Sequence, residues 1–274
     1  MTRIQMIDRT DPRLGRHINH DPRSRAYAFT APTAVLKAVE HPRHIPILDQ
    51  GNLGSCTGNA AVGALGSGPL WDALAVYAPQ LAGTLDEDLA VKVYSIATGL
   101  DDYAGDYPPD DTGSDGLSVA KAVVRLGFAP GYQHAFGMDA FLGALQVRPV
   151  IVGTNWHESM FWPSSSGLVT VDPASGVAGG HEYVARSFDP VSGLVGFDNS
   201  WGSGWGVGGS FFVGAGEFRE LLAADGDATV FTPLASPAPI PVPAPDPGNA
   251  FDQVIAGLRR VWPAFDAWCT RHGI

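Results

Sequence analysis

The feature that most constrains the fold of this chain is the stretch of residues 50–60, QGNLGSCTGNA, in which a glycine-rich turn leads to a cysteine. Small apolar residues follow at helical spacing: Ala60, Ala61, Ala64 and Leu65. We therefore predict that Cys56 begins a buried helix, whose unpaired N–H groups and dipole favour ionisation of the thiol. Three glycines each cost such a helix roughly 1 kcal/mol, which indicates a close approach by a neighbouring backbone: Gly58, Gly63 and Gly66.

Two further stretches bear on the role of this cysteine. A lone cysteine is more often a buried structural residue than a nucleophile. His181, however, follows two glycines, and Asn199 opens the run NSWG. They follow Cys56 by 125 and 143 residues, close to the roughly 130–150 residues that separate these residue types in one class of thiol enzyme. The order favours a nucleophile, its base and the residue that orients the base.

On these motifs, with Gln50 upstream, residues 45–232 resemble the papain-like cysteine peptidases of the C1 type. The resemblance implies that Cys56 is the nucleophile, that His181 is the general base and acid, and that Asn199 orients the imidazole. It implies that Gln50 and the backbone N–H of Cys56 donate to the oxyanion. It also implies supporting positions around the substrate cleft: Gly54, Ser55, Gly180, Glu182 and Trp201, the last covering the contact between His181 and Asn199.

Two positions depart from the pattern of that family. Thr57 follows the nucleophile where the family usually has a large aromatic residue, and Glu182 follows the base where the family has a small one. If the Glu182 carboxylate reaches the cleft, we expect a preference for substrates with Lys or Arg near the scissile bond. The alternative is a solvent-facing or internally paired Glu182. The family's usual disulfides are missing, because the only cysteines are Cys56 and Cys269.

The order of the predicted elements indicates an α+β fold of two lobes, with a helical N-terminal lobe and an antiparallel, barrel-like C-terminal lobe. Apolar periodicity predicts helices from Cys56 and over residues 69–77, 85–97, 116–126 and 138–146. Short β-branched and aromatic runs predict strands over residues 150–154, 168–171, 181–188, 193–197, 210–213 and 229–231. The resembled family has this architecture. Its cleft between the lobes, a favoured ligand site, brings Cys56 on a helix against His181 on a strand.

Charge and composition narrow the class of protein. The net charge of −11 argues against nonspecific binding of nucleic acid by the whole chain. If Cys56 is catalytic, no disulfide can form within one chain, which fits a reducing compartment. The N-terminus has no apolar core of signal-peptide length, and no apolar run approaches a transmembrane span. We therefore expect a soluble protein, with the cytoplasm favoured and no membrane partner.

Residues 1–44 form a basic N-terminal arm, expected to lie over the acidic catalytic domain of residues 45–234. The arm carries four histidines whose spacing matches no standard metal site: His17, His20, His41 and His44. An autoinhibitory role for the arm is an alternative that the sequence leaves open. Residues 101–115 hold six aspartates without the spacing of a calcium loop, and we expect a solvated acidic loop. No cofactor or metal is expected.

The C-terminal part of the chain reads as a separate unit. Residues 235–248 alternate proline with other residues, which is typical of an extended polyproline-II linker. Residues 249–269 place large apolar residues at spacings of three and four and predict an amphipathic helix within residues 249–274. This helix either docks on its own catalytic domain or provides a contact for a partner or for self-association.

The leading functional hypothesis is a peptidase that hydrolyses peptide bonds of peptide or protein substrates through a Cys56 thioester. Two alternatives stay open at this point. An acyl transferase or transpeptidase uses the same triad with a different acceptor. A noncatalytic papain-like scaffold would use the fold for binding, although such a module has no need of Cys56, His181, Asn199 and Gln50 together.

Overall fold

The computed structural model of the chain describes residues 3–30, 35–235 and 271. The chain divides into two compact units, residues 1–234 and residues 235–274. The predicted helix over 249–269 and the predicted linker beyond residue 235 lie outside the described residues, so both stay predictions. The boundary between arm and catalytic domain also stays a prediction. The structure below is that of the first unit.

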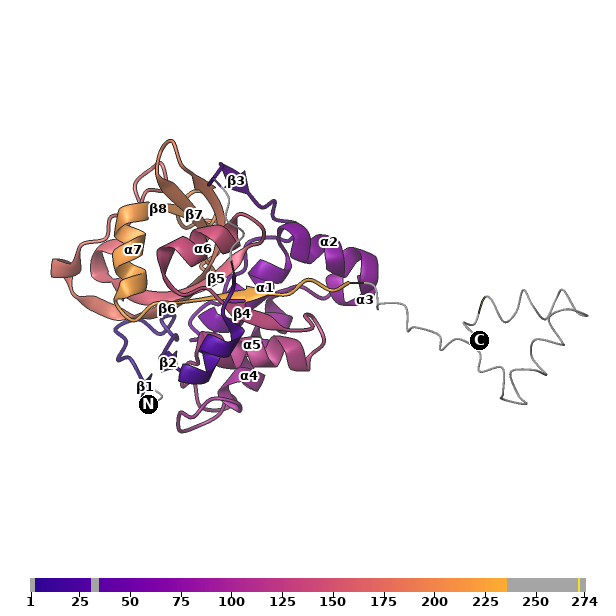
Figure 1. The fold of residues 1–274 in the computed structure, drawn as a ribbon. Helices are drawn as coiled ribbons and strands as arrows, with labels where there is room; N and C mark the ends of the chain where they lie inside the picture. Colours follow the sequence, from indigo (N-terminus) through magenta and orange to yellow (C-terminus); the bar gives the residue numbers. More distant parts are fainter. Residues whose placement is uncertain (1–2, 31–34, 236–270, 272–274) are drawn as a thin grey trace, which may run out of the picture. The chain divides into compact units, whose positions relative to one another are not determined.

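Helices of the N-terminal half pack together on one side of a sheet (Figure 1). They are α1 (Cys56–Leu65), α2 (Gly68–Tyr77), α3 (Pro79–Ala82), α4 (Glu87–Thr98) and α5 (Gly116–Arg125). The Asp86 carboxylate caps α4 by accepting from the Leu89 amide at 2.9 Å, and Asp115 caps α5 through Ser118 at 2.8 Å. A β-carbon on Gly58 would overlap the carbonyl oxygen of Ala90 in α4, so α1 lies directly against α4. The predicted close backbone approach is confirmed at Gly58, whereas Gly63 and Gly66 lie against the side chains of Val184 and Ile45.

The sheet is antiparallel between all paired neighbours and belongs mainly to the C-terminal half. In spatial order its strands are β4 (Tyr132–His134), β9 (Asp227–Phe231), β5 (Val150–His157), β6 (Val177–Asp189), β7 (Leu194–Asp198) and β8 (Ser210–Gly214), and β3 (Val39–Glu40) pairs with β6. Within the described structure, β4 and β8 stand at the two ends of the strand order and do not pair with each other. The barrel-like lobe is therefore an open sheet rather than a closed barrel.

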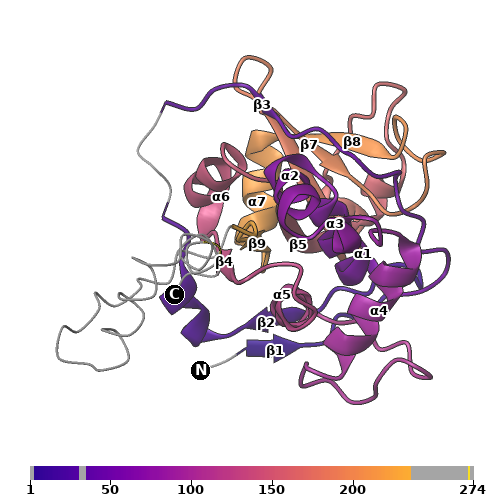
Figure 2. The ribbon, with the colours of Figure 1, turned by 90° about the vertical axis from the view of Figure 1, so that its right-hand side faces the viewer.

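Alternation along the central strands divides the hydrophobic core in two. On β5, Val150 and Val152 join the core beneath α6 (Gly137–Leu145) and α7 (Ala215–Ala223). Ile151 between them joins the core shared with α1, α4 and α5. This is the period of two expected of a strand buried on both faces. Figures 1 and 2 show the two groups of helices on opposite sides of the sheet. The central strands thus contribute side chains to the cores on both sides of the sheet.

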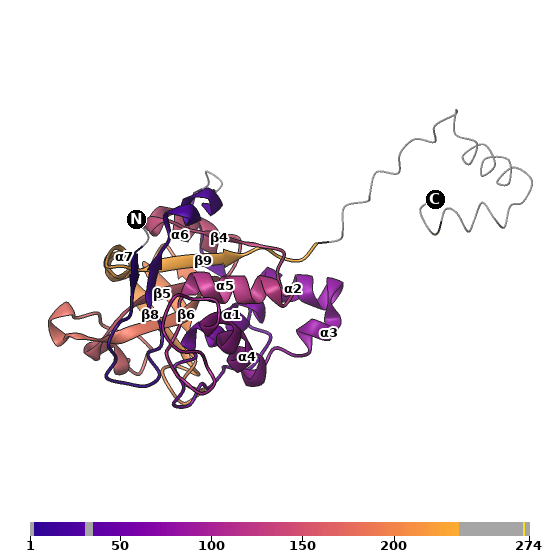
Figure 3. The same cartoon turned by 90° about the horizontal axis from the view of Figure 1, so that it is seen from below.

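The first part of the N-terminal arm forms a hairpin within this unit. β1 (Arg3–Gln5) pairs antiparallel with β2 (Ile18–His20), and the turn η1 (Pro22–Tyr27) follows. Figure 3 shows both strands lying beside β9 and α5. The loop between β1 and β2 leaves the hairpin and crosses the molecule. We call residues 9–17 of this loop the crossing segment.

Several elements differ from the sequence-based expectation. The strand predicted over residues 168–171 is wrong, because the described structure has only an isolated bridge there, between Leu168 and Phe212. α7, β4 and the arm strands were not predicted, and short turns η2 (Glu158–Phe161) and η3 (Pro173–Ser175) interrupt the chain after β5. Within the described residues, no helix is long and apolar enough to cross a bilayer.

Candidate active site

Cys56 is the first residue of α1 and is fully buried. Burial raises the pKa of its thiol to about 12. Backbone N–H groups of Glu182 and Gly15 act against this by hydrogen bonding to the sulfur, while the charge of Glu182 raises the pKa further. The expectation of an easily ionised thiol is therefore wrong for this form. The helix N-terminus favours a thiolate, but loss of solvent beneath the crossing segment outweighs it.

His181 lies on β6 and is hydrogen-bonded to Asn199, which follows β7. Its Nε2 is 2.7 Å from Asn199 Oδ1. The same Oδ1 accepts from the Ser200 amide at 2.8 Å, which identifies the atom as the amide oxygen. Nε2 must therefore carry the proton, and the lone pair stands on Nδ1. Within the described structure Nδ1 is buried and has no hydrogen-bond partner. The imidazole thus presents a free basic nitrogen.

Aromatic rings enclose this imidazole. The Trp201 ring lies 4.8 Å from the His181 ring at an interplanar angle of 33°, and Trp156 stands edge-on at 4.9 Å. Burial is the main cause that lowers the pKa of His181 to about 4; the Asn199 hydrogen bond raises it, and the charge of Arg13 lowers it. His181 is therefore neutral at neutral pH in this form.

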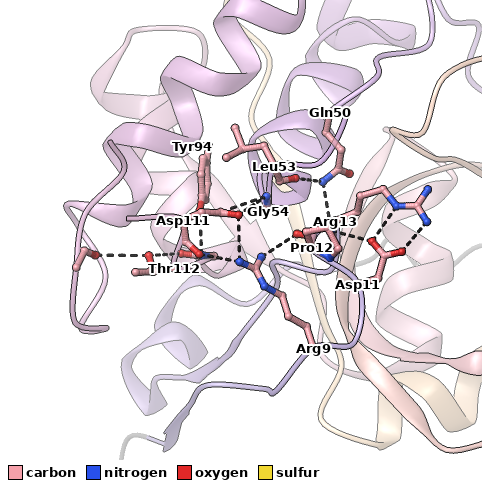
Figure 4. Close-up of polar contacts among 12 residues, drawn as sticks. Arg9, Asp11, Pro12, Arg13, Gln50, Leu53, Gly54, Tyr94, Asp111 and Thr112 are labelled. Carbon is pink, nitrogen blue, oxygen red and sulfur yellow. Dashed lines mark hydrogen bonds and ion pairs between the residues drawn. The ribbon is translucent and has the colours of Figure 1, made fainter. Parts of the chain in front are cut away.

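Gln50 joins the loop before α1 to the loop after β7. Its backbone N–H donates to the Ser200 carbonyl at 2.9 Å, and its Oε1 accepts from Ser200 Oγ at 2.6 Å. The side-chain Nε2 donates to the carbonyls of Leu53 at 2.6 Å and Arg13 at 3.0 Å (Figure 4). Because carbonyl oxygens only accept, these two contacts fix which end of the amide is nitrogen. One of its N–H groups therefore points at the arm.

The smaller predicted positions, Gly54, Ser55 and Gly180, lie around the same centre. The Gly54 amide donates to Asp111 at 3.1 Å, and Ser55 Oγ donates to Asn59 within α1 at 2.8 Å. A β-carbon on Gly54 would overlap the Arg9 guanidinium, and one on Gly180 would overlap the Arg16 carbonyl oxygen. Both glycines leave room for the arm.

The crossing segment runs over Cys56 between these glycines. Its Thr10 amide donates to the Ala178 carbonyl at 2.7 Å, and its Arg16 amide donates to the Gly180 carbonyl at 3.0 Å. Ser114 bonds it from the other side, donating to the Gly15 carbonyl and accepting from the His17 amide, both at 2.8 Å. A β-carbon on Gly15 would overlap the Gly54 carbonyl oxygen. The segment thus fills the space between α1 and β6.

Two arginines of the crossing segment contact side chains of the catalytic domain, Arg9 at Asp111 and Arg13 at Trp201. Arg13 is bound to Asp11 at 2.7 Å, and its guanidinium carbon lies 4.2 Å from the Trp201 ring centroid. Arg9 is bound to Asp111 at 3.0 Å, and Asp111 also accepts from Tyr94 at 2.7 Å. Figure 4 shows the Arg9 guanidinium beside Asp111 and Gly54, and the Arg13 backbone carbonyl beside the Gln50 side chain. The arm is part of the candidate site.

Glu182 is fully buried, so the solvent-facing alternative is wrong. Both of its carboxylate oxygens lack a hydrogen-bond partner within the described structure. Burial first, and then the charge of Asp227, raise its pKa well above the usual value, while Arg16 lowers it. The side chain belongs to a buried cluster with Arg16 and Asp227 rather than to an open surface.

Sequence reasoning missed the residues that close the site: Arg9, Arg13, Arg16, Asp111 and Asp227. None stands in a recognisable motif. The only hints were the charge difference between the arm and the rest of the chain and the density of aspartates in residues 101–115. That loop is not simply solvated as predicted, because Asp115 is buried and Asp111 is bound to the arm. The described residues contain no group of three or more potential ligands that could hold a metal ion.

Known proteins resemble this chain in structure rather than in sequence. No protein-family model matches it, and no curated protein matches it significantly. Xylellain, a cysteine protease from Xylella fastidiosa, is 18% identical with a TM-score of 0.61, over 76% of this chain and 92% of its own. The Amb a 11 cysteine protease of ragweed pollen, in its proform, is 19% identical with a TM-score of 0.54, over 76% and 70%.

Digestive procathepsin L 3 from the larval midgut of Tenebrio molitor is 15% identical with a TM-score of 0.52, over 75% of this chain and 73% of its own. At these identities the comparison shows the fold alone. The α+β architecture predicted from the sequence is confirmed, and this chain has the fold of the papain-like cysteine proteases.

Proposed function

We propose that this protein is a papain-like cysteine peptidase that hydrolyses peptide bonds through a thioester on Cys56. One observation carries the proposal. Asn199 accepts the Nε2 proton of His181 at 2.7 Å, and this leaves an unpartnered Nδ1 lone pair in a buried site. A side-chain amide that fixes the imidazole tautomer is what a thiol enzyme needs of its third residue. The shared fold of three cysteine proteases supports the same reading.

The proposed reaction follows from these roles. His181 Nδ1 takes the thiol proton, and the Cys56 sulfur forms a bond to the carbonyl carbon of the substrate. The imidazolium then gives the proton to the amide nitrogen as the C–N bond breaks, which releases the amine and leaves a thioester. A water molecule gives a proton to His181 as its oxygen attacks the thioester carbon; the C–S bond then breaks, and the imidazolium returns the proton to the leaving Cys56 sulfur. The products are a carboxylic acid and the free thiol.

Gln50 is proposed to stabilise the negative oxygen formed in both steps. Its Nε2–H group that now points at the Arg13 carbonyl is the available donor. Hydrogen bonds to Leu53 and Ser200 hold the amide in place before any substrate binds. A donor oriented in advance stabilises the transition state without reorganisation.

The same contacts imply that the described form is closed. The Arg13 carbonyl occupies the donor of Gln50, and the backbone N–H of Gly15 acts on the Cys56 thiol, where it lowers the pKa. A peptide substrate and the crossing segment cannot both lie there. The proposal therefore includes displacement of the crossing segment before turnover, which is the autoinhibitory role that the sequence left open.

The test is hydrolysis of a quenched-fluorescent peptide library by the full chain, with Cys56→Ala and His181→Ala side by side. Activity that disappears in both variants, with unchanged circular dichroism, supports the peptidase. An added amine acceptor, with analysis of the products, separates hydrolysis from acyl transfer. Hydrolysis that survives Cys56→Ala contradicts the proposal.

A further inference from the structure

One arm side chain goes into the interior instead of lying on the surface. The Arg16 amide pairs with the carbonyl of Gly180, the residue before His181. Its guanidinium is fully buried, which is rare for arginine unless the charge is compensated. Arg16 thus enters the protein one residue away from the proposed base.

Oxygen atoms of the catalytic domain surround this guanidinium. Nε donates to Asp227 Oδ2 at 3.1 Å, and Nη2 donates to the same oxygen and to the Asp225 carbonyl, the latter at 2.6 Å. Glu182 supplies a second buried carboxylate, and Asp115 contributes negative charge. We call the space bounded by Glu182, Asp227 and the glycines Gly116 and Gly153 the acidic pocket.

The two glycines make the acidic pocket possible. A β-carbon on Gly153 would lie 2.6 Å from both Arg16 Nε and Glu182 Oε2, and 2.8 Å from Asp227 Oδ2. One on Gly116 would lie 2.6 Å from Asp227 Oδ1. A side chain at Gly153 would enter the space that the guanidinium now takes, and one at Gly116 would overlap the carboxylates of Asp227 and Glu182. The walls come from β5, β6, β9 and α5, and none comes from the arm.

The match between Arg16 and the acidic pocket is incomplete. Among the described residues, both Glu182 oxygens, Asp227 Oδ1 and Arg16 Nη1 are buried without a hydrogen-bond partner. A permanent structural ion pair normally satisfies such groups, because unpaired buried polar atoms are costly. The acidic pocket therefore offers more acceptors than Arg16 uses.

Displacement of the crossing segment would leave the acidic pocket without its cation. Two or three carboxylates would then share a buried space, which is unfavourable unless they bind protons or another cation. A peptide that paired with Gly180 in place of Arg16 would direct a side chain into this space. A guanidinium fits best, since its planar set of donors matches carboxylate oxygens.

We propose that the acidic pocket binds a cationic side chain, arginine above all, of the peptide substrate, and that Arg16 occupies it in the closed form as a substitute for that side chain. The inference rests on the proposed function only where it calls the bound peptide a substrate. The binding site itself does not depend on the chemistry at Cys56. Arg16 and the substrate side chain compete for one place, so the arm opposes binding most strongly for the substrates that the pocket prefers.

The experiment measures binding to the full chain carrying Cys56→Ala, in which no hydrolysis occurs. The probes are acetylated hexapeptides with one arginine moved through each position, and matched peptides with citrulline, which has the same shape without the charge. Dissociation constants are measured with Arg16 present and with Arg16→Ala. Arg16→Gln is a second variant that keeps bulk and a donor, in case the alanine variant does not fold.

We expect the best arginine peptide to bind Arg16→Ala at least 10-fold more tightly than its citrulline match, and at least 10-fold more tightly than it binds the chain with Arg16 intact. Asp227→Asn should bring the arginine-to-citrulline ratio close to one. The matched control is Glu220→Gln, an exposed carboxylate on α7, which should leave the ratio unchanged. Equal binding of the two peptides, no binding of either, or a ratio that Asp227→Asn does not change overturns the acidic pocket.

The same peptides separate this inference from the proposed function. Arginine-selective binding with no hydrolysis by the chain that carries Arg16→Ala with Cys56 intact leaves the acidic pocket and contradicts the peptidase. Hydrolysis with no preference for arginine over citrulline leaves the peptidase and contradicts the acidic pocket.

Discussion

The side-chain amide of Gln50 donates to the backbone carbonyl of Arg13 across 3.0 Å. This contact joins the N-terminal arm directly to a group that we propose for catalysis. The amide is held independently by Leu53 and by Ser200, each at 2.6 Å. Displacement of the Arg13 carbonyl would therefore free a donor that is already oriented, so the inhibition that we propose for the arm would be relieved at a group that is ready for the reaction.

Gln50→Ala should lower kcat about 100-fold or more once the arm is displaced, because one oxyanion donor is lost. KM should change less, since this donor acts mainly on the transition state. Steady-state kinetics on one cleaved peptide measures both constants. Gln80→Ala, on the exposed face of α3, is the control and should behave as the parent does. A fall in kcat/KM caused by KM alone would contradict the oxyanion role.

Asn199→Ala should reduce kcat by about 10-fold or more, because the His181 tautomer with a free Nδ1 is no longer fixed. The tautomer itself can be measured by nitrogen NMR of labelled histidine. The intact chain should show protonated Nε2, and the variant a mixture of both forms. Asn155→Ala, which removes only a bond to the Ala224 carbonyl, should leave the spectrum of His181 unchanged. Protonated Nδ1 in the intact chain would refute the assignment.

Alkylation of Cys56 should be slow in the closed form. With a thiol pKa of about 12, only about one molecule in ten thousand carries a thiolate at pH 8. Gly15→Ala places a methyl group against the Gly54 carbonyl and should loosen the crossing segment. We expect alkylation by iodoacetamide to become at least 10-fold faster, measured at Cys56 by peptide mass spectrometry.

The matched control for that prediction is Gly216→Ala, where a β-carbon meets open space. It should leave the rate of alkylation at Cys56 unchanged. Fast alkylation of the unaltered chain, or equal rates for Gly15→Ala and the parent, would mean that the crossing segment does not shield the thiol.

Helices with a clear apolar period were predictable from the sequence. The predictions for α4 and α5 end within one residue of the observed ends, and α4 begins two residues later than predicted because Asp86 caps it. The strand predicted over residues 168–171 failed because only Leu168 makes a bridge there. The motif residues could be recognised because a nucleophile, its base and the orienting residue need specific residue types in a known order.

The arrangement of the arm could not be predicted in the same way. Arg16 and Asp227 are 211 residues apart, and neither has a local pattern that indicates a partner. The basic arm and the acidic remainder of the chain suggested attraction, but not which charges meet. The pKa of Cys56 was misjudged for the same reason, since the helix end is a local feature and burial by the crossing segment is not.

Protonation of the buried histidines should destabilise the protein in acid. Burial lowers the pKa of His181 to about 4, and it also lowers the pKa values of His17, His41 and His134. The histidines of the unfolded chain bind protons near pH 6.5 and those of the folded chain do so at lower pH, so their contribution to stability is complete above pH 6.5 and falls as the pH drops toward 4. At about 1.4 kcal/mol per pKa unit, His181 alone accounts for roughly 3 kcal/mol.

Thermal unfolding of the full chain at pH 7 and at pH 4.5 measures this loss, with His181→Gln as the comparison. The variant cannot titrate at this position and should lose less stability between the two pH values. An identical loss in both proteins would show that His181 is not held neutral by burial.

The central claim is that Cys56 forms a thioester with His181 as its base. Peptide hydrolysis by the full chain and by Cys56→Ala, on the same library and with matched circular dichroism, tests it most directly. We predict turnover by the full chain that rises when Gly15→Ala loosens the crossing segment, and no turnover above background in any chain that carries Cys56→Ala. Equal turnover with and without the Cys56 sulfur would contradict the claim.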